Sequence, residues 1–212
     1  MARLRLVVLV SGRGSNLDAL LAASRSGAMH ADVVRVVSNR EAAPALDVAR
    51  AAGVEASVVP SASLARDEHE ERLFPVIDAA KPDLIALAGY MRVLGPRFLA
   101  RYQGKVVNIH PSLLPAFPGM DAQGQAFARG VRIAGCTTHF VTEDVDAGPI
   151  LAQAAVAVDP RWSADELRVR ILELEHALYP RSVDMLATGR ARLVGGRVVV
   201  DEPAAILSGG AK

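Results

Sequence analysis

The sequence predicts a doubly wound α/β fold, in which a mostly parallel sheet carries helices on both faces. Apolar runs rich in valine, isoleucine and leucine alternate with segments of helical periodicity between Leu4 and His110. Apolar residues make up 51% of the 212 positions, and a chain of this length can bury one well-packed core. We therefore expect a single domain over residues 1–203, followed by a flexible tail over residues 204–212.

Strands are expected where short apolar runs end in turn residues, and helices where apolar residues recur every three or four positions. The first run, MARLRLVVLV, breaks at Ser11-Gly12 without a small-residue cleavage site, which favours a strand over a secretory signal. No apolar run approaches membrane-spanning length. The expected strands of the N-terminal half are Leu4–Val10, Val33–Ser38, Ala56–Val59, Leu84–Ala88 and Val106–His110, and its expected helices are Leu17–Ser26, Pro44–Ala52, Arg66–Ala80 and Pro96–Tyr102.

The C-terminal half carries clear start and turn signals. Ser163-Ala-Asp-Glu166 is a capping box, so a long C-terminal helix should begin there and end before Gly189. Gly195-Gly196 between two short β-rich runs predicts a terminal hairpin. The expected elements of this half are the strands Cys136–Val141 and Ile150–Val158, the helix up to Thr188, and the short hairpin strands Ala191–Val194 and Val198–Val200.

Asn108-Ile109-His110-Pro111 closes the fifth expected strand. Side chains two residues apart on a strand point to the same side, so Asn108 and His110 should project together. Ligands of doubly wound sheets bind at the carboxyl ends of the strands, where this pair stands. An amide N–H can stabilise an oxyanion, and an imidazole can give or take a proton near neutral pH. The pair therefore predicts a site for attack on a carbonyl group.

Asp146 is the carboxylate best placed to orient that imidazole, because it stands just before the turn signal Gly148-Pro149. His139, on the sixth expected strand, could join the site or fill the face of the sheet. His110, His139 and Asp146 could instead bind a divalent metal. Asn108 would be a poor ligand, however, and the spacing of zinc-binding helices is absent. We expect no metal.

The segment Ser11-Gly-Arg-Gly-Ser-Asn-Leu17 joins the first strand to the first helix. A glycine-rich turn at a helix N-terminus offers backbone N–H groups and the positive end of the helix dipole to a phosphate. The dinucleotide fingerprint is not met, because Leu17 stands at its third glycine and Ser38-Asn39-Arg40 replaces its acid. The segment predicts either a phosphomonoester site or a plain strand-to-helix turn capped by Ser15 or Asn16.

Charge and cysteine content restrict the partners. The 24 basic and 23 acidic residues give a formal net charge of +1, so no global field attracts nucleic acid or a membrane surface. Cys136 is the only cysteine, which excludes an internal disulfide and fits a reducing, cytoplasmic compartment; its apolar setting indicates a buried, inert thiol. His30 and His69 stand in polar contexts and are expected at the surface. We expect small-molecule substrates and no nucleic-acid or membrane partner, with a homodimer left open.

Five motifs follow one another along the chain: SGRGSNL (11–17), AGYMRVL (88–94), NIHPSLLP (108–115), THFVTEDVDAGP (138–149) and EHALYP (175–180). By these motifs, which cover nearly its whole length, the chain resembles the phosphoribosylglycinamide formyltransferases. The resemblance implies a Rossmann-like formyltransferase fold. It also implies transfer of the formyl group of the co-substrate 10-formyltetrahydrofolate to the amine of glycinamide ribonucleotide, in de novo purine biosynthesis. The third and fourth motifs are shared with other formyltetrahydrofolate-using enzymes, and the first favours the ribonucleotide enzyme.

The resemblance also implies roles for individual residues. Asn108 and His110 would be catalytic and stabilise the oxyanion, while Asp146 would tune His110 by its charge and hydrogen bonding. The ribonucleotide would be bound by Gly14, Ser15, Asn16 and Glu175, and the folate by Arg66, Met91, Arg92, Val93, Leu94 and Asn108.

Several alternatives stay open. Met91 and Leu94 could be plain core, and Arg66 could belong to a solvated helix face. The chain could also be a formyltetrahydrofolate hydrolase, a methionyl-tRNA formyltransferase or a non-catalytic nucleotide-binding module. The first two should carry a further domain, and the third has no need of an amide, an imidazole and a carboxylate at these spacings. Ribose and loop contacts are open at four positions that depart from the pattern of some relatives: Ala116, Gln123, Ala147 and Leu172.

Overall fold

The computed structural model describes residues 2–201 and 204–208. The chain divides into two compact units, Met1–Asn108 and Ile109–Lys212. None of the helices within the described residues is long and apolar enough to cross a membrane.

Parallel strands form the sheet of the first unit, in the order β3-β2-β1-β4-β5. Leu6–Val10 of the first strand are completely buried, because a parallel strand in the middle of a sheet is covered on both faces. This explains why the first strand is a continuous apolar run. The strands are β1 (Leu4–Val10), β2 (Ala31–Ser38), β3 (Glu55–Val58), β4 (Leu84–Leu87) and β5 (Val106–His110), the last of which continues into the second unit.

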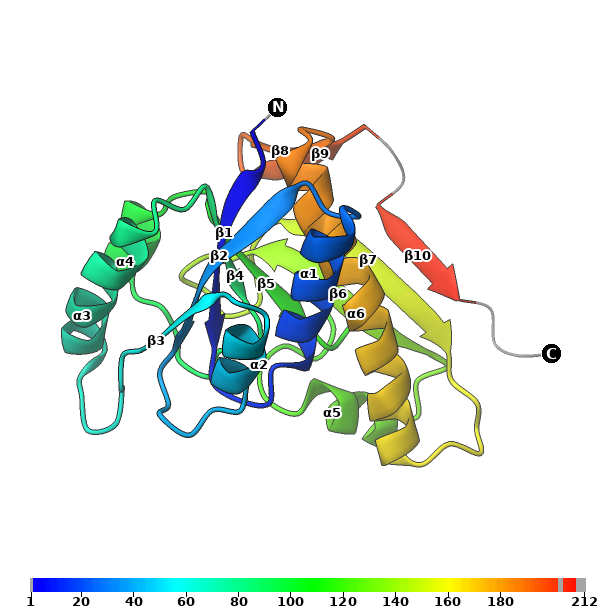
Figure 1. The fold of residues 1–212 in the computed structure, drawn as a ribbon. Coiled ribbons are helices and arrows are strands. Elements are labelled where there is room, and N and C mark those ends of the chain that lie inside the picture. Colours follow the sequence, from blue (N-terminus) through cyan, green and yellow to red (C-terminus); the bar gives the residue numbers. More distant parts are fainter. Residues whose placement is uncertain (1, 202–203, 209–212) are drawn as a thin grey trace. The chain divides into compact units, whose positions relative to one another are not determined.

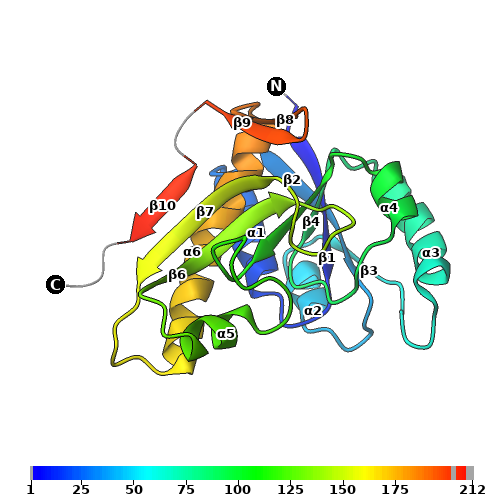
Figure 2. The ribbon, with the colours of Figure 1, turned by 180° about the vertical axis from the view of Figure 1, so that it is seen from behind.

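Helices cover both faces of this sheet. The pair α1 and α2 lies on one face, and α3 and α4 lie on the other (Figures 1 and 2). The strand order reverses between β1 and β4, and in such folds this switch point is where ligands bind, at the carboxyl ends of the strands. The helix bounds are α1 (Ser15–Ser26), α2 (Ala45–Ala51), α3 (Arg66–Ala79) and α4 (Pro96–Arg101).

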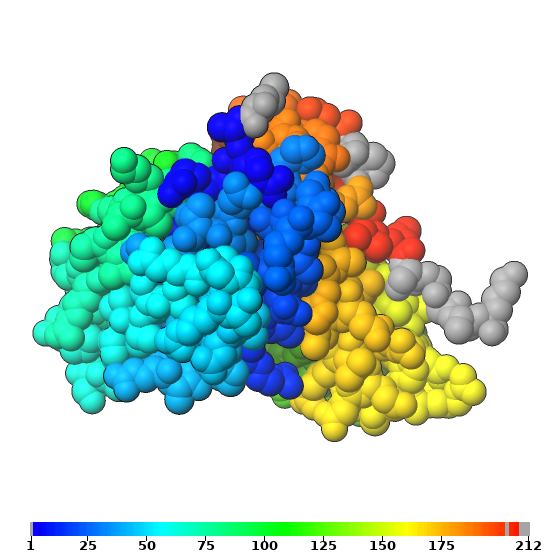
Figure 3. All heavy atoms as spheres, viewed as in Figure 1, coloured from blue at the N-terminus to red at the C-terminus, as the bar shows by residue number. Residues whose placement is uncertain are grey.

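The second unit is built on an antiparallel pair of strands, β6 (Ile133–Phe140) and β7 (Ile150–Ala157), against which the long helix α6 (Ala164–Ala187) packs. The capping box is present: Ser163 Oγ accepts from the Glu166 N–H, and the Glu166 carboxylate accepts from the Ser163 N–H. The start of α6 and the loop before it lie at the surface (Figure 3, yellow). The remaining elements are α5 (Ala122–Ala128), the hairpin β8 (Ala191–Val194) and β9 (Arg197–Val200), and β10 (Ala205–Ser208).

The expected mostly parallel, doubly wound sheet with a long C-terminal helix and a terminal hairpin is confirmed. Ala205–Ser208, expected within the tail, instead form β10, which pairs in parallel with β7; residues 209–212 of that expected tail lie outside the described part. Helix α5 was not expected, because AQGQAFA carries a glycine in its interior and only one large apolar side chain, so it shows no apolar stripe at helical spacing. The prediction that His69 lies at the surface is wrong, since its side chain is buried on α3.

Candidate active site

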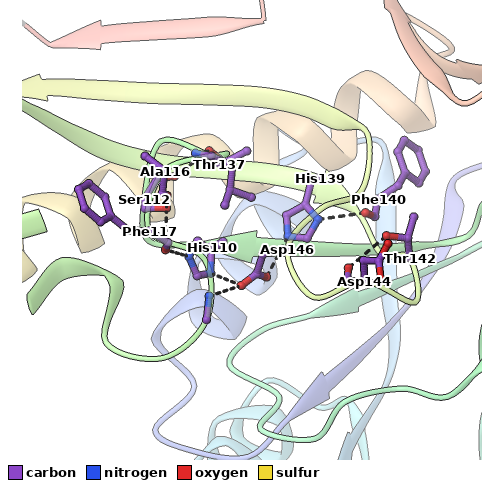
Figure 4. A network of polar contacts seen from close by, with 12 residues as sticks. His110, Ser112, Ala116, Phe117, Thr137, His139, Phe140, Thr142, Asp144 and Asp146 are labelled. Atoms are coloured by element: carbon purple, nitrogen blue, oxygen red, sulfur yellow. Dashed lines mark hydrogen bonds and ion pairs between the residues drawn. The ribbon is translucent and has the colours of Figure 1, made fainter. Parts of the chain in front are cut away.

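His110 ends β5 with both of its ring nitrogens next to oxygen atoms. Nδ1 lies 3.2 Å from Oδ2 of Asp146, and Nε2 lies 2.9 Å from the carbonyl oxygen of Phe117 (Figure 4). A carbonyl oxygen can only accept a hydrogen bond, so Nε2 must carry the hydrogen of that bond. A carboxylate is also an acceptor, so the doubly protonated ring is the form that satisfies both contacts.

Asp146 lies between two imidazoles, with His110 on one side and His139 on the other. Its Oδ2 also accepts the Gly119 N–H at 2.8 Å, and its Oδ1 lies 3.6 Å from Nε2 of His139. The structure thus brings together the His110–Asp146 pair expected from the sequence. It also adds His139, whose Nδ1 lies 3.0 Å from the Phe140 carbonyl oxygen.

Neighbouring groups keep the Asp146 carboxylate ionised. Burial raises the pKa of Asp146, but the close contact with His139, the hydrogen bond from the Gly119 N–H and the positive charge of the imidazoles outweigh it, so the pKa lies below its ordinary value. Asp146 also adopts a left-handed backbone conformation, with φ of 55°. Aspartate and asparagine tolerate this conformation better than other non-glycine residues.

The chain around Asp146 is shaped by a close backbone approach at Gly148. A Cβ atom added there would lie 1.8 Å from the carbonyl oxygen of Phe140, so only glycine fits. The Phe140 N–H donates to the Pro149 carbonyl at 2.9 Å. Gly148-Pro149 therefore closes the loop that begins after β6 and carries Asp146.

The carbonyl that faces His110 Nε2 is held in a tight loop. Ser112 Oγ donates to the Ala116 carbonyl at 2.6 Å, and Phe117 has a left-handed φ of 55°. From β6, Thr137 Oγ1 accepts the Leu114 N–H at 3.0 Å and donates to the Ser112 carbonyl at 2.7 Å. Sequence reasoning missed Thr137 and Phe117, because neither the hydroxyl contact nor a backbone carbonyl leaves a pattern in sequence spacing.

The glycine-rich loop belongs to the first unit and leads directly into α1. Gly14 precedes the helix with a left-handed φ of 89°, and Ser15 is the first helical residue. A Cβ at Gly14 would lie 2.8 Å from Cβ of Ala45. The loop thus needs glycine at position 14, and Ser15 and Asn16 lie in the first turn of α1, at the positive end of the helix dipole.

The segment expected to bind folate follows β4, also in the first unit. Met91 and Val93 are 50% and 55% exposed, whereas Leu94 is buried. The plain-core reading therefore does not fit Met91. The Arg92 guanidinium is turned toward the chain before α3 and donates to the carbonyls of Ser61 and Leu64, at 3.2 Å in each case.

Helix α3 contacts the residues that flank this segment, Tyr90 and Gly95. The hydroxyl of Tyr90 lies 2.8 Å from Nε2 of His69, and the Gly95 N–H donates to Glu70 Oε1 at 2.6 Å. Both α3 side chains are buried. Arg66, at the start of α3, is half exposed and lies 3.9 Å from Asp67 in an ion pair.

The other expected site residues are distributed over both units. Asn108 lies on β5, where it pairs with Leu87 of β4. Glu175 is buried on α6, and its charge adds to the burial that raises the pKa of Cys136, which stays a buried thiol. Within residues 2–201 and 204–208, no group of three or more histidine, cysteine or acidic side chains has an arrangement suited to a metal.

Comparison with known proteins gives consistent matches. The family described as "Formyl transferase" matches residues 4–183. The phosphoribosylglycinamide formyltransferase of Escherichia coli is 39% identical over 191 residues, which cover 90% of each chain. The trifunctional purine biosynthetic protein adenosine-3 of Drosophila melanogaster is 46% identical over 192 residues, but the chain spans 14% of that protein's length. The crystal structure of glycinamide ribonucleotide transformylase 1 from Symbiobacterium toebii superposes with a TM-score of 0.91, at 44% identity and 95% coverage of both chains.

Proposed function

The chain belongs to the formyl transferase family, and from this we propose that it transfers the formyl group of 10-formyltetrahydrofolate to the amine of N1-(5-phosphoribosyl)glycinamide, in de novo purine biosynthesis. The observation that carries the proposal is the match to the E. coli phosphoribosylglycinamide formyltransferase over 90% of both chains. The His110–Asp146 pair supports it, because both residues lie in motifs on which the resemblance rests.

The chemistry begins with attack of the substrate amine on the formyl carbon. This attack produces a tetrahedral intermediate with a negative oxygen and a positive nitrogen. We assign the stabilisation of that oxygen to the Asn108 amide and the protonated His110 ring. A donor of this kind contributes about 3 kcal/mol to transition-state stabilisation. Because Nε2 of His110 already donates to the Phe117 carbonyl, donation to the substrate through this atom requires that bond to be shared or exchanged.

Asp146 acts through His110 in this proposal. Its lowered pKa keeps it a carboxylate at neutral pH, and a carboxylate 3.2 Å from Nδ1 favours the protonated ring. A bound water carries the proton of the attacking amine to N10 of the folate, the bond between N10 and the formyl carbon breaks, and tetrahydrofolate leaves as a neutral amine. No covalent enzyme intermediate is required, because the amine attacks the formyl group directly.

Substrate binding is assigned to two segments of the first unit and to three further residues, which are Arg66, Asn108 and Glu175. The phosphate is held by Gly14, Ser15 and Asn16, since a helix N-terminus preceded by a left-handed glycine attracts anions. Glu175 binds the ribose. The folate is held by Arg66, Asn108 and the segment Met91, Arg92, Val93 and Leu94, in which two apolar side chains are exposed.

Residues 1–203 are proposed to form a single formyltransferase domain, which the family match over residues 4–183 supports. The partners are then the two small-molecule substrates, without a nucleic acid or a membrane surface. A cytoplasmic location is proposed because the chain has one cysteine and that cysteine is buried. The number of subunits is left open.

The test is to mix the protein with 10-formyltetrahydrofolate and follow loss of the formyl group with and without glycinamide ribonucleotide. Formyl transfer that depends on the ribonucleotide, and that is lost in His110→Ala, supports the proposal. Equal release of formate in both reactions would show a hydrolase instead, and no release in either would show a non-catalytic protein.

A further inference from the structure

Three buried polar side chains in the first unit, Ser11, Asn39 and Ser61, belong to a chain of hydrogen bonds that begins and ends at the segment Met91–Arg92. The Met91 N–H donates to Ser11 Oγ at 2.8 Å, and Ser11 Oγ donates to Asn39 Oδ1 at 2.5 Å. Asn39 Nδ2 then donates to Ser61 Oγ at 3.0 Å, and the Ser61 carbonyl accepts from Arg92. Since Met91 and Arg92 are neighbours in the sequence, the chain of bonds returns to the segment where it began.

This ring of hydrogen bonds lies at the carboxyl ends of the parallel strands. Ser11 follows β1, Asn39 follows β2, Ser61 follows β3 and Met91 follows β4, so the ring joins the carboxyl ends of four parallel strands. Its Ser11–Met91 bond bridges β1 and β4, between which the strand order reverses. That is the point at which ligands bind in such sheets.

Asn39 is the member that orients the others. Its amide is buried and makes one hydrogen bond through the oxygen and one through the nitrogen, so it orients the Ser11 hydroxyl hydrogen and donates to the Ser61 oxygen. Ser11 uses its hydroxyl hydrogen toward Asn39, which leaves a lone pair for the Met91 N–H. Without Asn39 the Ser11 hydroxyl could rotate, and the Met91 N–H would lose its fixed acceptor.

We propose that Asn39 is a positioning residue for the folate co-substrate, which acts through Ser11 and Ser61 to hold the segment Met91–Leu94. This inference rests on the proposed function. It adds to that function a residue that lies outside all five sequence motifs. Asn39 stands where a dinucleotide-binding protein would carry an acid that binds the ribose. Here the side chain binds Ser11 and Ser61 of the protein instead.

The test measures steady-state constants for both substrates in Asn39→Ala, Ser61→Ala and the double variant. Asn39→Ala should raise KM for 10-formyltetrahydrofolate at least about fivefold, the low end for leaving a buried hydrogen-bonding group unsatisfied. KM for the ribonucleotide and kcat should change less. The double variant should raise this KM by clearly less than the product of the two single effects, because either change alone already opens the ring. Ser61→Ala removes a single hydroxyl and provides a milder variant if Asn39→Ala does not fold.

Ser38→Ala is the matched control. This serine is also buried and lies next to Asn39, but its hydroxyl bonds to the backbone of Arg40 alone, at 2.8 and 3.0 Å. Calorimetric titration with tetrahydrofolate gives a binding constant that does not depend on turnover. An active parent in which Asn39→Ala leaves both folate constants unchanged overturns the inference alone. An inactive parent that also fails to bind tetrahydrofolate overturns the proposed function and the inference together.

Discussion

Replacing Asp146 by asparagine should reduce kcat at least about 100-fold, while both substrates still bind. Asparagine has the same size, tolerates the left-handed φ of 55°, and can still accept the Gly119 N–H through its oxygen. The change therefore removes mainly the negative charge. That charge lies 3.2 Å from Nδ1 of His110, where attraction to a protonated ring is about 5 kcal/mol at an effective dielectric constant of 20.

Desolvation of the buried pair offsets much of this attraction. A remaining loss of about 2.7 kcal/mol in transition-state stabilisation is already a 100-fold loss of rate. The assay is steady-state formyl transfer at neutral pH, with kcat and both KM values measured for the parent, Asp146→Asn and the control Asp144→Asn. Asp144 is an exposed carboxylate in the same loop, so its variant should keep parental turnover. A kcat of Asp146→Asn within a few-fold of the parent would refute the assigned coupling between Asp146 and His110.

Three further substitutions test other parts of the structure. Gly14→Val should raise KM for the ribonucleotide much more than KM for the folate, because an added Cβ would lie 2.8 Å from Cβ of Ala45 at a φ of 89°. The control is Gly12→Ala, since a Cβ at position 12 would meet no neighbouring atom. An equal rise in both KM values would count against a phosphate site. Met91→Ala should weaken folate binding by roughly 1–3 kcal/mol through lost apolar contact. Thermal stability should not change, because the Met91 side chain is half exposed. A lower Tm with unchanged folate binding would contradict the assignment of Met91 to the folate site. Glu70→Gln tests pH dependence, because burial raises the pKa of Glu70 above its ordinary value of 4.5. The folded parent then binds this proton more tightly than the unfolded chain, so urea unfolding should show the parent gaining stability relative to the variant as pH falls through the raised pKa, with no further gain below 4.5. A difference that does not vary with pH would exclude this linkage.

Sequence patterns were sufficient for the main elements and for the contact between His110 and Asp146. The end of the strand at His110 and the turn at Gly148 are both visible in the local sequence. Together they predicted that the side chains of His110 and Asp146 lie near each other. His69 was misplaced because its neighbours in sequence are charged, whereas its burial depends on Tyr90, which is distant in sequence. Asn39 was noticed only as a missing acid, since a ring of hydrogen bonds between four strand ends has no spacing that a sequence can display.

Strand β10 was missed for a related reason. Its residues stand between Pro203 and Gly209-Gly210 near the end of the chain, a setting typical of a frayed end, and their pairing with β7 is a long-range interaction. Elements defined by their own sequence were thus predictable, whereas elements and contacts defined by distant partners were not.

Gly148 and the pair His110 and Asp146 are required for different reasons. Position 148 requires glycine because a Cβ there would lie 1.8 Å from the Phe140 carbonyl oxygen, so the requirement comes from the backbone geometry of the loop. His110 and Asp146 are instead required by the proposed reaction. A related sequence that has given up catalysis but kept the fold should therefore keep the glycine and be free to change the histidine and the aspartate. In genome surveys, that combination would distinguish pseudoenzymes from working members of the family, whereas loss of the glycine would indicate a loop that follows a different course.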